Sequence, residues 1–327
     1  MAVRSELTSS IMRTILISMT FRTALVALAM AVALVGSGCS SSSPSSPSAA
    51  GKLTIVASFF PLEQLVKGVA DPSWKLTTLT AAGVEPHDLE LRPSQVVAID
   101  QADLVVYLGD GFQPALEDAL KQRTGPKLDL LAGRKDLHRL GVEAQSGPAS
   151  AETVDPHIWL DPVRYASLIA PTVSALASLD RSASSRIAQR GAAFRASVLA
   201  LDGNYASGLR KCASRTLVTG HAAFGYMAER YQLTQHAVSG LSPDTEPGPD
   251  RLAEIASIVK REHVTTVFTE TLVPPDLAET LARETGATAA VLNPLEGVTS
   301  RQARAAVSYI SLMHDNLDAL RTGLRCA

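Results

Sequence analysis

The segment ADLVVYLGDG, residues 102–111, contains a strongly apolar strand that ends in a glycine-rich turn, and it indicates how the chain folds. An earlier run, Leu53–Ala57, has the same buried-strand character, and Trp74–Leu79 predicts another strand. Short helices are predicted between these strands at Leu62–Val69 and Ser94–Ile99, each after a proline. Strands that alternate with helices predict an α/β fold with a parallel sheet.

The same alternation returns from residue 215 to the end of the chain. The predicted strands are Thr216–Thr219, Gln235–Ser239, Thr265–Phe268 and Thr288–Leu292. The predicted helices are Phe224–Tyr231, a helix opened by Pro249, Pro275–Thr285 closed by Gly286, and a final helix whose apolar stripe is Ile310, Met313, Leu317, Leu320 and Leu324. We expect each apolar stripe to pack against a sheet.

A long helix is predicted between the two halves. Its apolar face is Ile187, Phe194, Val198, Leu201 and Tyr205, at spacings of seven, four, three and four. Its two glycines each weaken it by about 1 kcal/mol relative to alanine. Before it, residues 141–155 are rich in Gly, Ser, Ala, Glu and Pro, which indicates a mobile surface loop.

A chain of 327 residues is long for one compact domain, so we expect two. The predicted boundaries are an N-terminal α/β lobe over 52–175, a long bridging helix over 176–212 and a C-terminal α/β lobe over 213–327. Each lobe is expected to have its own apolar core.

The first residues have the layout of a signal peptide, predicted over 1–38. Three arginines precede the apolar run Thr23–Val35, and small residues lead from there to Cys39. The segment resembles a bacterial lipoprotein signal, with Gly36 where a bulky aliphatic residue is usual, and predicts lipidation of Cys39. Residues 39–51, mostly Ser, Pro and Ala, predict a flexible tether. The alternative is an uncleaved transmembrane anchor; either way the folded part lies outside the cytoplasm.

Two further cysteines, Cys212 and Cys326, are expected to form a disulfide, because an even pair in an oxidising compartment is more often bonded than free. The net charge is -2, and the chain has no run of Lys and Arg. Nucleic acids and anionic membrane surfaces are therefore not expected as partners.

Three of the seven histidines, His87, His157 and His221, are predicted to lie in loops at strand ends. The other four have settings typical of solvated or core imidazoles: His138 in a polar turn, His236 in a strand, His263 at a helix end and His314 inside the last helix. Loops at the carboxyl ends of parallel strands converge, and three imidazoles leave one tetrahedral position of Zn²⁺ for a carboxylate. Spacing alone does not establish such a site.

Several motifs add context to these histidines. They are Gly83–His87, Asp155–Pro162 (DPHIWLDP), Val218–Tyr226 (VTGHAAFGY), Gly240–Pro243, Leu292–Glu296 (LNPLE) and Tyr309–Leu320. Taken together, the chain from Leu53 to its C-terminus resembles the cluster A-I zinc/manganese solute-binding proteins of ABC transporters. The resemblance implies two α/β lobes bridged by a single long rigid helix, with the metal site between the lobes.

The resemblance also implies the ligands. His87, His157 and His221 match the first three ligand positions, and Glu296 matches the fourth ligand of one zinc-binding branch; other branches use an Asp where this chain has Asn293. Manganese-selective relatives place a carboxylate at the third position, so His221 favours Zn²⁺ over Mn²⁺.

Four carboxylates are candidates to orient the imidazoles, with solvated loop positions as the alternative: Glu85, Asp155, Asp161 and Glu270. One departure from many zinc-binding members is that residues 141–154 contain no histidine, where those proteins carry a His-rich loop.

The resemblance implies a protein that captures Zn²⁺ outside the cytoplasm and delivers the metal to an ABC transporter permease. We expect a monomer that touches the membrane through its N-terminal lipid only. It is not expected to be an enzyme. A surface adhesin on the same fold and a zinc hydrolase remain the alternatives.

Overall fold

The computed structural model describes residues 52–140 and 153–327 of the chain. The predicted signal peptide, the lipidation site Cys39, the tether and most of the predicted surface loop lie outside these ranges. Within them, no helix combines the length and the apolar character needed to cross a bilayer.

The N-terminal lobe is built on a parallel sheet with the strand order β2-β1-β3-β4. Its strands are β1 (Thr54–Ala57), β2 (Lys75–Thr78), β3 (Leu104–Tyr107) and β4 (Lys127–Asp129), and its helices are α2 (Phe60–Val69), α3 (Pro93–Gln101) and α4 (Pro114–Gln122). All three helices have a proline in their first turn, where its missing N–H has no intrahelical partner to lose. Neither α4 nor β4 was among the elements predicted from the sequence.

The C-terminal lobe repeats this plan with the strand order β10-β9-β7-β8, again all parallel. Its strands are β7 (Thr216–Thr219), β8 (Thr234–Ala237), β9 (Thr266–Thr269) and β10 (Thr288–Val291), and its helices are α8 (Gly225–Arg230), α9 (Pro249–Arg261) and α10 (Asp276–Thr285). Gly286 ends α10 in a left-handed conformation, φ 76°, as its place after the helix predicts. These elements confirm the predicted α/β class.

The segment between the two sheets is mostly helical. It comprises β5 (Arg139–Leu140), β6 (Thr153–Val154), the 3₁₀ turns η1 (Ile158–Leu160) and η2 (Arg181–Ala183), α5 (Pro162–Ser167), α6 (Ile169–Leu179) and α7 (Ser184–Gly208). The prediction of a mobile loop as far as Asp155 is wrong at its end, because β6 pairs with β5 and Asp155 is buried.

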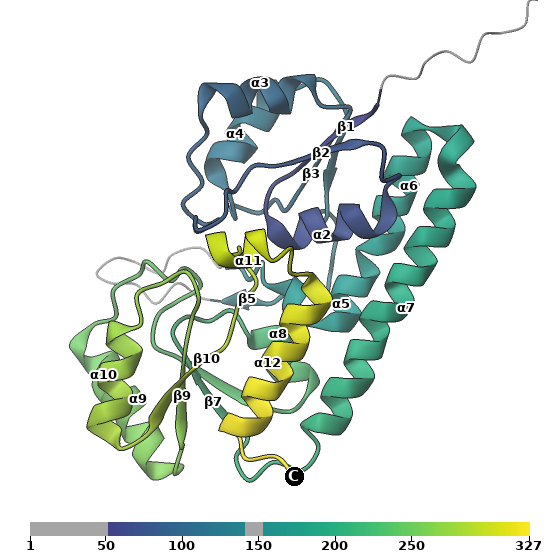
Figure 1. Ribbon diagram of the computed structural model, residues 1–327. Coiled ribbons are helices and arrows are strands. Elements are labelled where there is room, and N and C mark those ends of the chain that lie inside the picture. Colours follow the sequence, from purple (N-terminus) through teal and green to yellow (C-terminus); the bar gives the residue numbers. More distant parts are fainter. Residues whose placement is uncertain (1–51, 141–152) are drawn as a thin grey trace, which may run out of the picture. The chain divides into compact units, whose positions relative to one another are not determined.

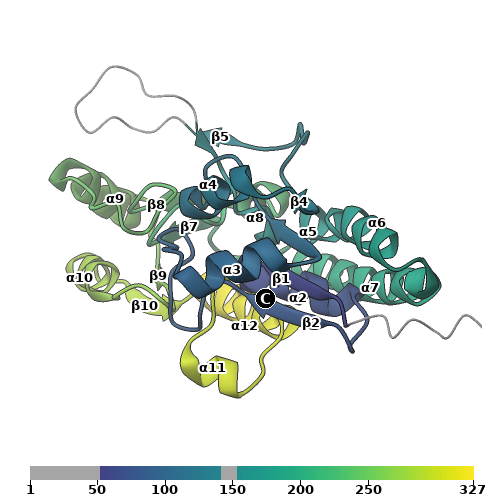
Figure 2. The same cartoon turned by 90° about the horizontal axis from the view of Figure 1, so that it is seen from above.

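The long helix α7 lies within the predicted range 176–212 and runs beside both lobes (Figure 1). Figure 2 shows α6 and α7 on one side of the sheets and α9 and α10 on the other. After β10, the chain forms α11 (Ser300–Arg304) and returns along α7 as α12 (Tyr309–Gly323), so α12 and α7 pack together.

The expectation of two independent cores is wrong. One cluster of buried apolar side chains continues from Ile55 of β1 through Ile187 and Tyr205 of α7 to Leu217 of β7 and Leu320 of α12. Two smaller clusters lie under α3 and α4 and under α9 and α10, on the outer faces of the sheets. The interior of the two lobes is thus continuous through α7 and α12, which helps to hold their ligand-bearing loops in register.

Two glycines of α7 give a matched pair of stability predictions. A Cβ at Gly191 would collide with Cγ2 of Val173, a short and stiff side chain on α6, whereas a Cβ at Gly203 would meet nothing within 4 Å. Gly191→Ala is expected to lower the free energy of unfolding by about 1–3 kcal/mol through overpacking. Gly203→Ala is expected to raise it by about 0.5–1 kcal/mol through helix propensity. Urea unfolding checks both, and equal effects of the two substitutions would contradict the close α6–α7 packing.

Candidate metal centre

Four side chains of metal-ligating type converge where the two lobes meet: His87, His157, His221 and Glu296. One potential ligand atom from each lies within 4.8 Å of all the others. Oε1 of Glu296 is 3.1 Å from Nε2 of His87, 2.9 Å from Nε2 of His157 and 3.2 Å from Nε2 of His221. Three imidazole nitrogens thus surround one carboxylate oxygen.

Each of these residues lies in a loop of the α/β framework. His87 follows β2, His157 directly precedes η1, His221 is two residues beyond β7, and Glu296 follows β10. Two of them belong to the N-terminal lobe and two to the C-terminal lobe, so the site needs both. Strand ends at one edge of each sheet explain why residues as much as 209 positions apart, His87 and Glu296, come together.

Buried carboxylates orient two of the imidazoles. Nδ1 of His157 is 2.8 Å from Oδ1 of Asp155, and Nδ1 of His221 is 2.6 Å from Oε2 of Glu270. The same carboxylates accept the backbone N–H of the histidine they orient, at 3.0 and 2.8 Å. With the proton on Nδ1, Nε2 presents its lone pair to the centre, the arrangement that metal-binding histidines use.

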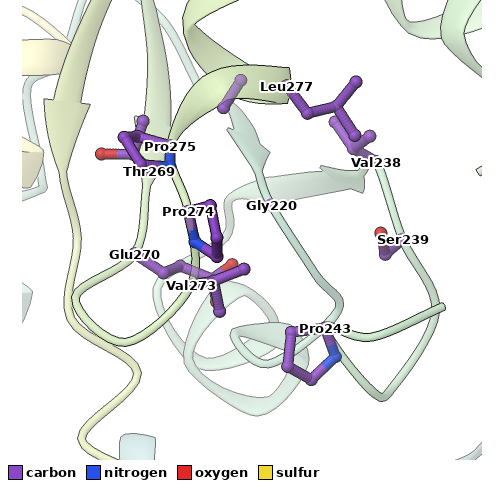
Figure 3. A pocket seen from close by; sticks show the side chains of 11 residues that line it. Gly220, Val238, Ser239, Pro243, Thr269, Glu270, Val273, Pro274, Pro275 and Leu277 are labelled. Carbon is purple, nitrogen blue, oxygen red and sulfur yellow. The ribbon is translucent and has the colours of Figure 1, made fainter. Parts of the chain in front are cut away.

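Gly220 makes room for this arrangement, because a Cβ on it would lie 2.5 Å from Oε1 of Glu270. Gly220 and Glu270 also line a small cavity, together with apolar side chains such as Val238, Pro274 and Leu277 (Figure 3). The cavity has no signal in the sequence, because residues of separate strands, loops and α10 form its walls.

The other two candidate carboxylates have different roles. Oε1 of Glu85 is 3.5 Å from the backbone N of His87 and its Oε2 is buried without a hydrogen-bond partner. Asp161 caps α5 and pairs with Arg164 and Arg230, which ties α5 to α8 across the lobes. Asp161 therefore joins the lobes rather than orienting an imidazole.

His87 is held less firmly than the other two histidines. Its side chain is 11% exposed, against 0% for His157 and His221. In the described part of the chain, no carboxylate is bonded to its Nδ1. The ring packs edge-on against Phe112, with centroids 4.8 Å apart, and Gln113 donates to the carbonyl of Pro86, at 3.1 Å, to fix its loop. Neither contact has a signal in the sequence, because each joins His87 or its loop to a distant part of the chain.

The electrostatics of the centre depend on burial and on Glu296. Burial by itself would raise the pKa of Glu296, but the charge of His221 and hydrogen bonds from the histidines lower it well below its usual range. Burial lowers the pKa of His87. The pKa of Glu85 is raised to about 9, first by burial and then by the negative charge of Glu296. An ionised carboxylate therefore faces three imidazoles in a site almost closed to water.

This donor set is suited to one kind of ligand. Imidazole lone pairs directed at a carboxylate oxygen repel it unless a proton or a cation lies between them. Three nitrogens and one oxygen make a closed tetrahedral set for Zn²⁺, whereas Mn²⁺ prefers more oxygen donors. Asn293 is not part of the set, because its side-chain oxygen accepts from the backbone N of Leu295 and from the hydroxyl of Thr271.

Comparison with known proteins identifies the family. The model of the family "Zinc-uptake complex component A periplasmic", ZnuA, matches residues 55–323. The zinc-binding lipoprotein AdcA of Streptococcus pneumoniae is 36% identical over 285 residues, which are 84% of this chain and 56% of AdcA. This chain thus spans little more than half the length of the AdcA relatives. The high-affinity zinc uptake system protein ZnuA of Bacillus subtilis is 30% identical over 88% of this chain and 92% of its own length.

Solved structures show the same fold. The Zn(II)-bound ZnuA-like domain of Streptococcus pneumoniae AdcA has a TM-score of 0.70 and 33% identity, over 84% of this chain and 99% of that one. The laminin-binding protein Lmb of Streptococcus agalactiae, described as having adhesin and metal transporting activity, has a TM-score of 0.73 and 29% identity, over 83% and 99% of the two chains. Since the family model covers nearly all of the described residues, the chain belongs to the ZnuA family of periplasmic zinc-uptake components.

Proposed function

We propose that this protein captures Zn²⁺ outside the cytoplasm with His87, His157, His221 and Glu296 and delivers it to an ABC transporter permease for import. The observation that carries the proposal is the contact of Oε1 of Glu296 with all three Nε2 atoms, within 3.2 Å. The names of the relatives, a zinc-binding lipoprotein and a zinc uptake protein, agree with it.

The fourth ligand favours a protein that binds Zn²⁺ without catalysing a reaction. A catalytic zinc site keeps one position open for water or substrate, whereas here a buried carboxylate occupies the place where that water would bind. The site also takes ligands from both lobes, so metal binding favours their closed arrangement. We therefore propose a solute-binding protein rather than a zinc hydrolase.

We also propose that the protein is attached to the membrane through its N-terminus. Lipidation at Cys39 would anchor a monomer to the outer face of the cell membrane, and the tether to residue 51 would let the folded part reach its permease. The relative named as a lipoprotein supports this anchoring. Metabolic labelling with a fatty acid tests it, since a Cys39→Ala chain should then carry no label.

Calorimetry tests the proposed function. The full-length protein, freed of metal, is titrated with Zn²⁺ and separately with Mn²⁺. We expect one Zn²⁺ per chain and much weaker binding of Mn²⁺, and cells that lack the protein should accumulate less zinc in zinc-poor medium. Absence of zinc binding would contradict the proposal. A metal-bound water at an open coordination position in a zinc-bound structure would contradict it as well, because such a site is typical of a hydrolase.

The pH dependence of binding is a further prediction. Burial by itself would lower the pKa of His157 and His221, but their hydrogen bonds and charge interactions with Asp155, Glu270 and Glu296 raise both. A raised pKa means that these imidazoles keep their protons to higher pH, so protons compete with Zn²⁺ already above pH ~6.5. Affinity should fall as pH decreases, by at least about a hundredfold between pH 7.5 and 5, since each displaced proton costs up to tenfold per pH unit. Constant affinity over this range would contradict a three-histidine site.

A second candidate function is adhesion, because two laminin-binding proteins, of Streptococcus agalactiae and Streptococcus pyogenes, are among the similar solved structures. Binding of the full-length protein to immobilised laminin tests it. Adhesion that persists in a chain with a disabled metal site would make it an independent activity, and absence of binding would leave transport alone.

A further inference from the structure

One buried polar side chain interrupts the apolar core face of α12. The core face of this helix is formed by apolar residues such as Leu312, Met313, Leu317 and Leu320, yet Asn316 lies among them and is 2% exposed. Burying an amide costs about 1–3 kcal/mol unless it is hydrogen-bonded. An apolar residue would be the simpler choice for packing, so the amide indicates a specific partner.

That partner is the loop that carries Glu296. Oδ1 of Asn316 accepts the backbone N–H of Asn293 at 2.8 Å, and Nδ2 of Asn316 donates to the carbonyl of Asn293 at 2.6 Å. Both polar groups of one peptide residue are therefore held by a single side chain. Asn293 lies two residues after β10 and three residues before the ligand.

The rest of the loop is held just as closely. The side-chain oxygen of Asn293 accepts from the backbone N of Leu295 at 2.8 Å and from the hydroxyl of Thr271 at 3.1 Å. Across the lobe boundary, the indole N–H of Trp159 donates to the carbonyl of Pro294 at 2.7 Å. Leu295 is fully buried and has φ 56°, a left-handed conformation that a leucine keeps only where its surroundings enforce it.

We propose that Asn316 is a positioning residue that fixes Glu296 at the fourth corner of the site and thereby sets its preference for Zn²⁺ over Mn²⁺. The inference rests on the proposed function. A rigid set of four donors fits tetrahedral Zn²⁺ and cannot expand to the higher coordination that Mn²⁺ prefers. Oε2 of Glu296 is buried and has no partner among the described residues, so a loosened loop would let this oxygen bind as well and admit the larger ion.

The test compares Asn316→Leu with wild type in the full-length protein, by competition of Zn²⁺ and Mn²⁺ against a fluorescent chelator. Loss of a group that supports a metal ligand typically costs about 10–100-fold in affinity, and we expect this for Zn²⁺. For Mn²⁺ we expect no loss of affinity and at most about a threefold gain, because a flexible site suits it. The ratio of Zn²⁺ to Mn²⁺ affinity should thus fall by about tenfold or more.

Tyr205→Phe is the matched control. The hydroxyl of Tyr205 on α7 donates to the carbonyl of Met313 on α12 at 2.7 Å. Tyr205 is as deeply buried as Asn316, but no hydrogen bond joins its side chain to the Glu296 loop. This variant should lose stability and keep the wild-type affinity ratio. If both variants change the ratio equally, Asn316 acts only through the packing of α12 and the proposal is overturned.

Thr271→Val keeps the test decisive if Asn316→Leu does not fold, since it removes one hydrogen bond from Asn293 with little change in shape. We expect a smaller fall in the ratio, by about threefold to tenfold. An unchanged ratio in the folded variants overturns the role of Asn316 while wild type still binds Zn²⁺. Failure of wild type itself to bind Zn²⁺ overturns the proposed function instead.

Discussion

Replacing His157 with alanine is expected to weaken Zn²⁺ binding by at least about a thousandfold. Loss of a residue that merely supports a ligand costs about 10–100-fold, and His157 is itself a proposed ligand, so its loss should cost more. Its ring is fully buried, and among the described residues the metal-ligating group beside Glu296 contains no further side chain that could take its place as a ligand. Competition against a chelator of known affinity measures the loss.

The fold should survive the same substitution. The His157→Ala chain keeps the backbone N–H that Asp155 accepts at 3.0 Å, so the buried carboxylate retains one partner. Removing an imidazole also relieves the crowding of lone pairs around Glu296 in the metal-free protein. We therefore expect a circular dichroism spectrum like that of wild type.

His314→Ala is the matched control for this prediction. It removes an exposed histidine of α12, away from the cluster around Glu296, and should leave Zn²⁺ affinity unchanged. Comparable affinities of the His157→Ala protein and wild type would remove His157 from the site. A large loss of affinity in the His314→Ala protein would show instead that zinc binds to histidines of the surface.

The regular elements could be predicted because their signals are local. Apolar runs such as Leu53–Ala57 and Thr216–Thr219 contain β1 and β7 within a residue or so of their ends, and Gly286 marks the end of α10. The strand β4 has only three residues, one of them a lysine, so no periodic pattern distinguishes it from a loop. The continuous core was missed because contacts between lobes have no sequence period.

For the site, the sequence motifs suggested which residues to consider, and distant contacts decided their arrangement. Asp155 lies two residues from His157, so their contact is almost local, whereas Glu270 is 49 residues from His221. The hydrogen bond from Trp159 to Pro294 joins residues 135 apart. Such hydrogen bonds depend on how the lobes pack, so they cannot be predicted from the spacing of residues in one sequence.

The disulfide is the second feature with a large expected effect. Cys212 and Cys326 are bonded to each other, as predicted, and the bond encloses a loop with a sequence separation of 114 residues. The bond joins the segment after α7 to the segment after α12. Because these segments flank the C-terminal lobe, the bond restricts the conformations that this whole part of the chain adopts when unfolded. In the chain-entropy model, a loop of about 100 residues corresponds to about 4–5 kcal/mol.

The Cys212→Ser/Cys326→Ser protein is therefore expected to lose about 4 kcal/mol of unfolding free energy. Its native structure should persist, because backbone hydrogen bonds beside the disulfide hold the same two segments: Ala213 to Arg325 at 3.2 Å, Ser214 to Leu324 at 3.1 Å and Ala327 to Lys211 at 2.8 Å. Urea unfolding with and without reductant measures the effect.

Reductant is the internal control of this experiment. It should destabilise wild type to the level of the double variant and leave the double variant unchanged. Zn²⁺ affinity should stay within about threefold of wild type, because Asn316, the contact of α12 with the Glu296 loop, lies about three turns before the disulfide. A stability loss below about 1 kcal/mol would mean that the unfolded chain is already compact, and that backbone contacts rather than the disulfide hold the C-terminus in place.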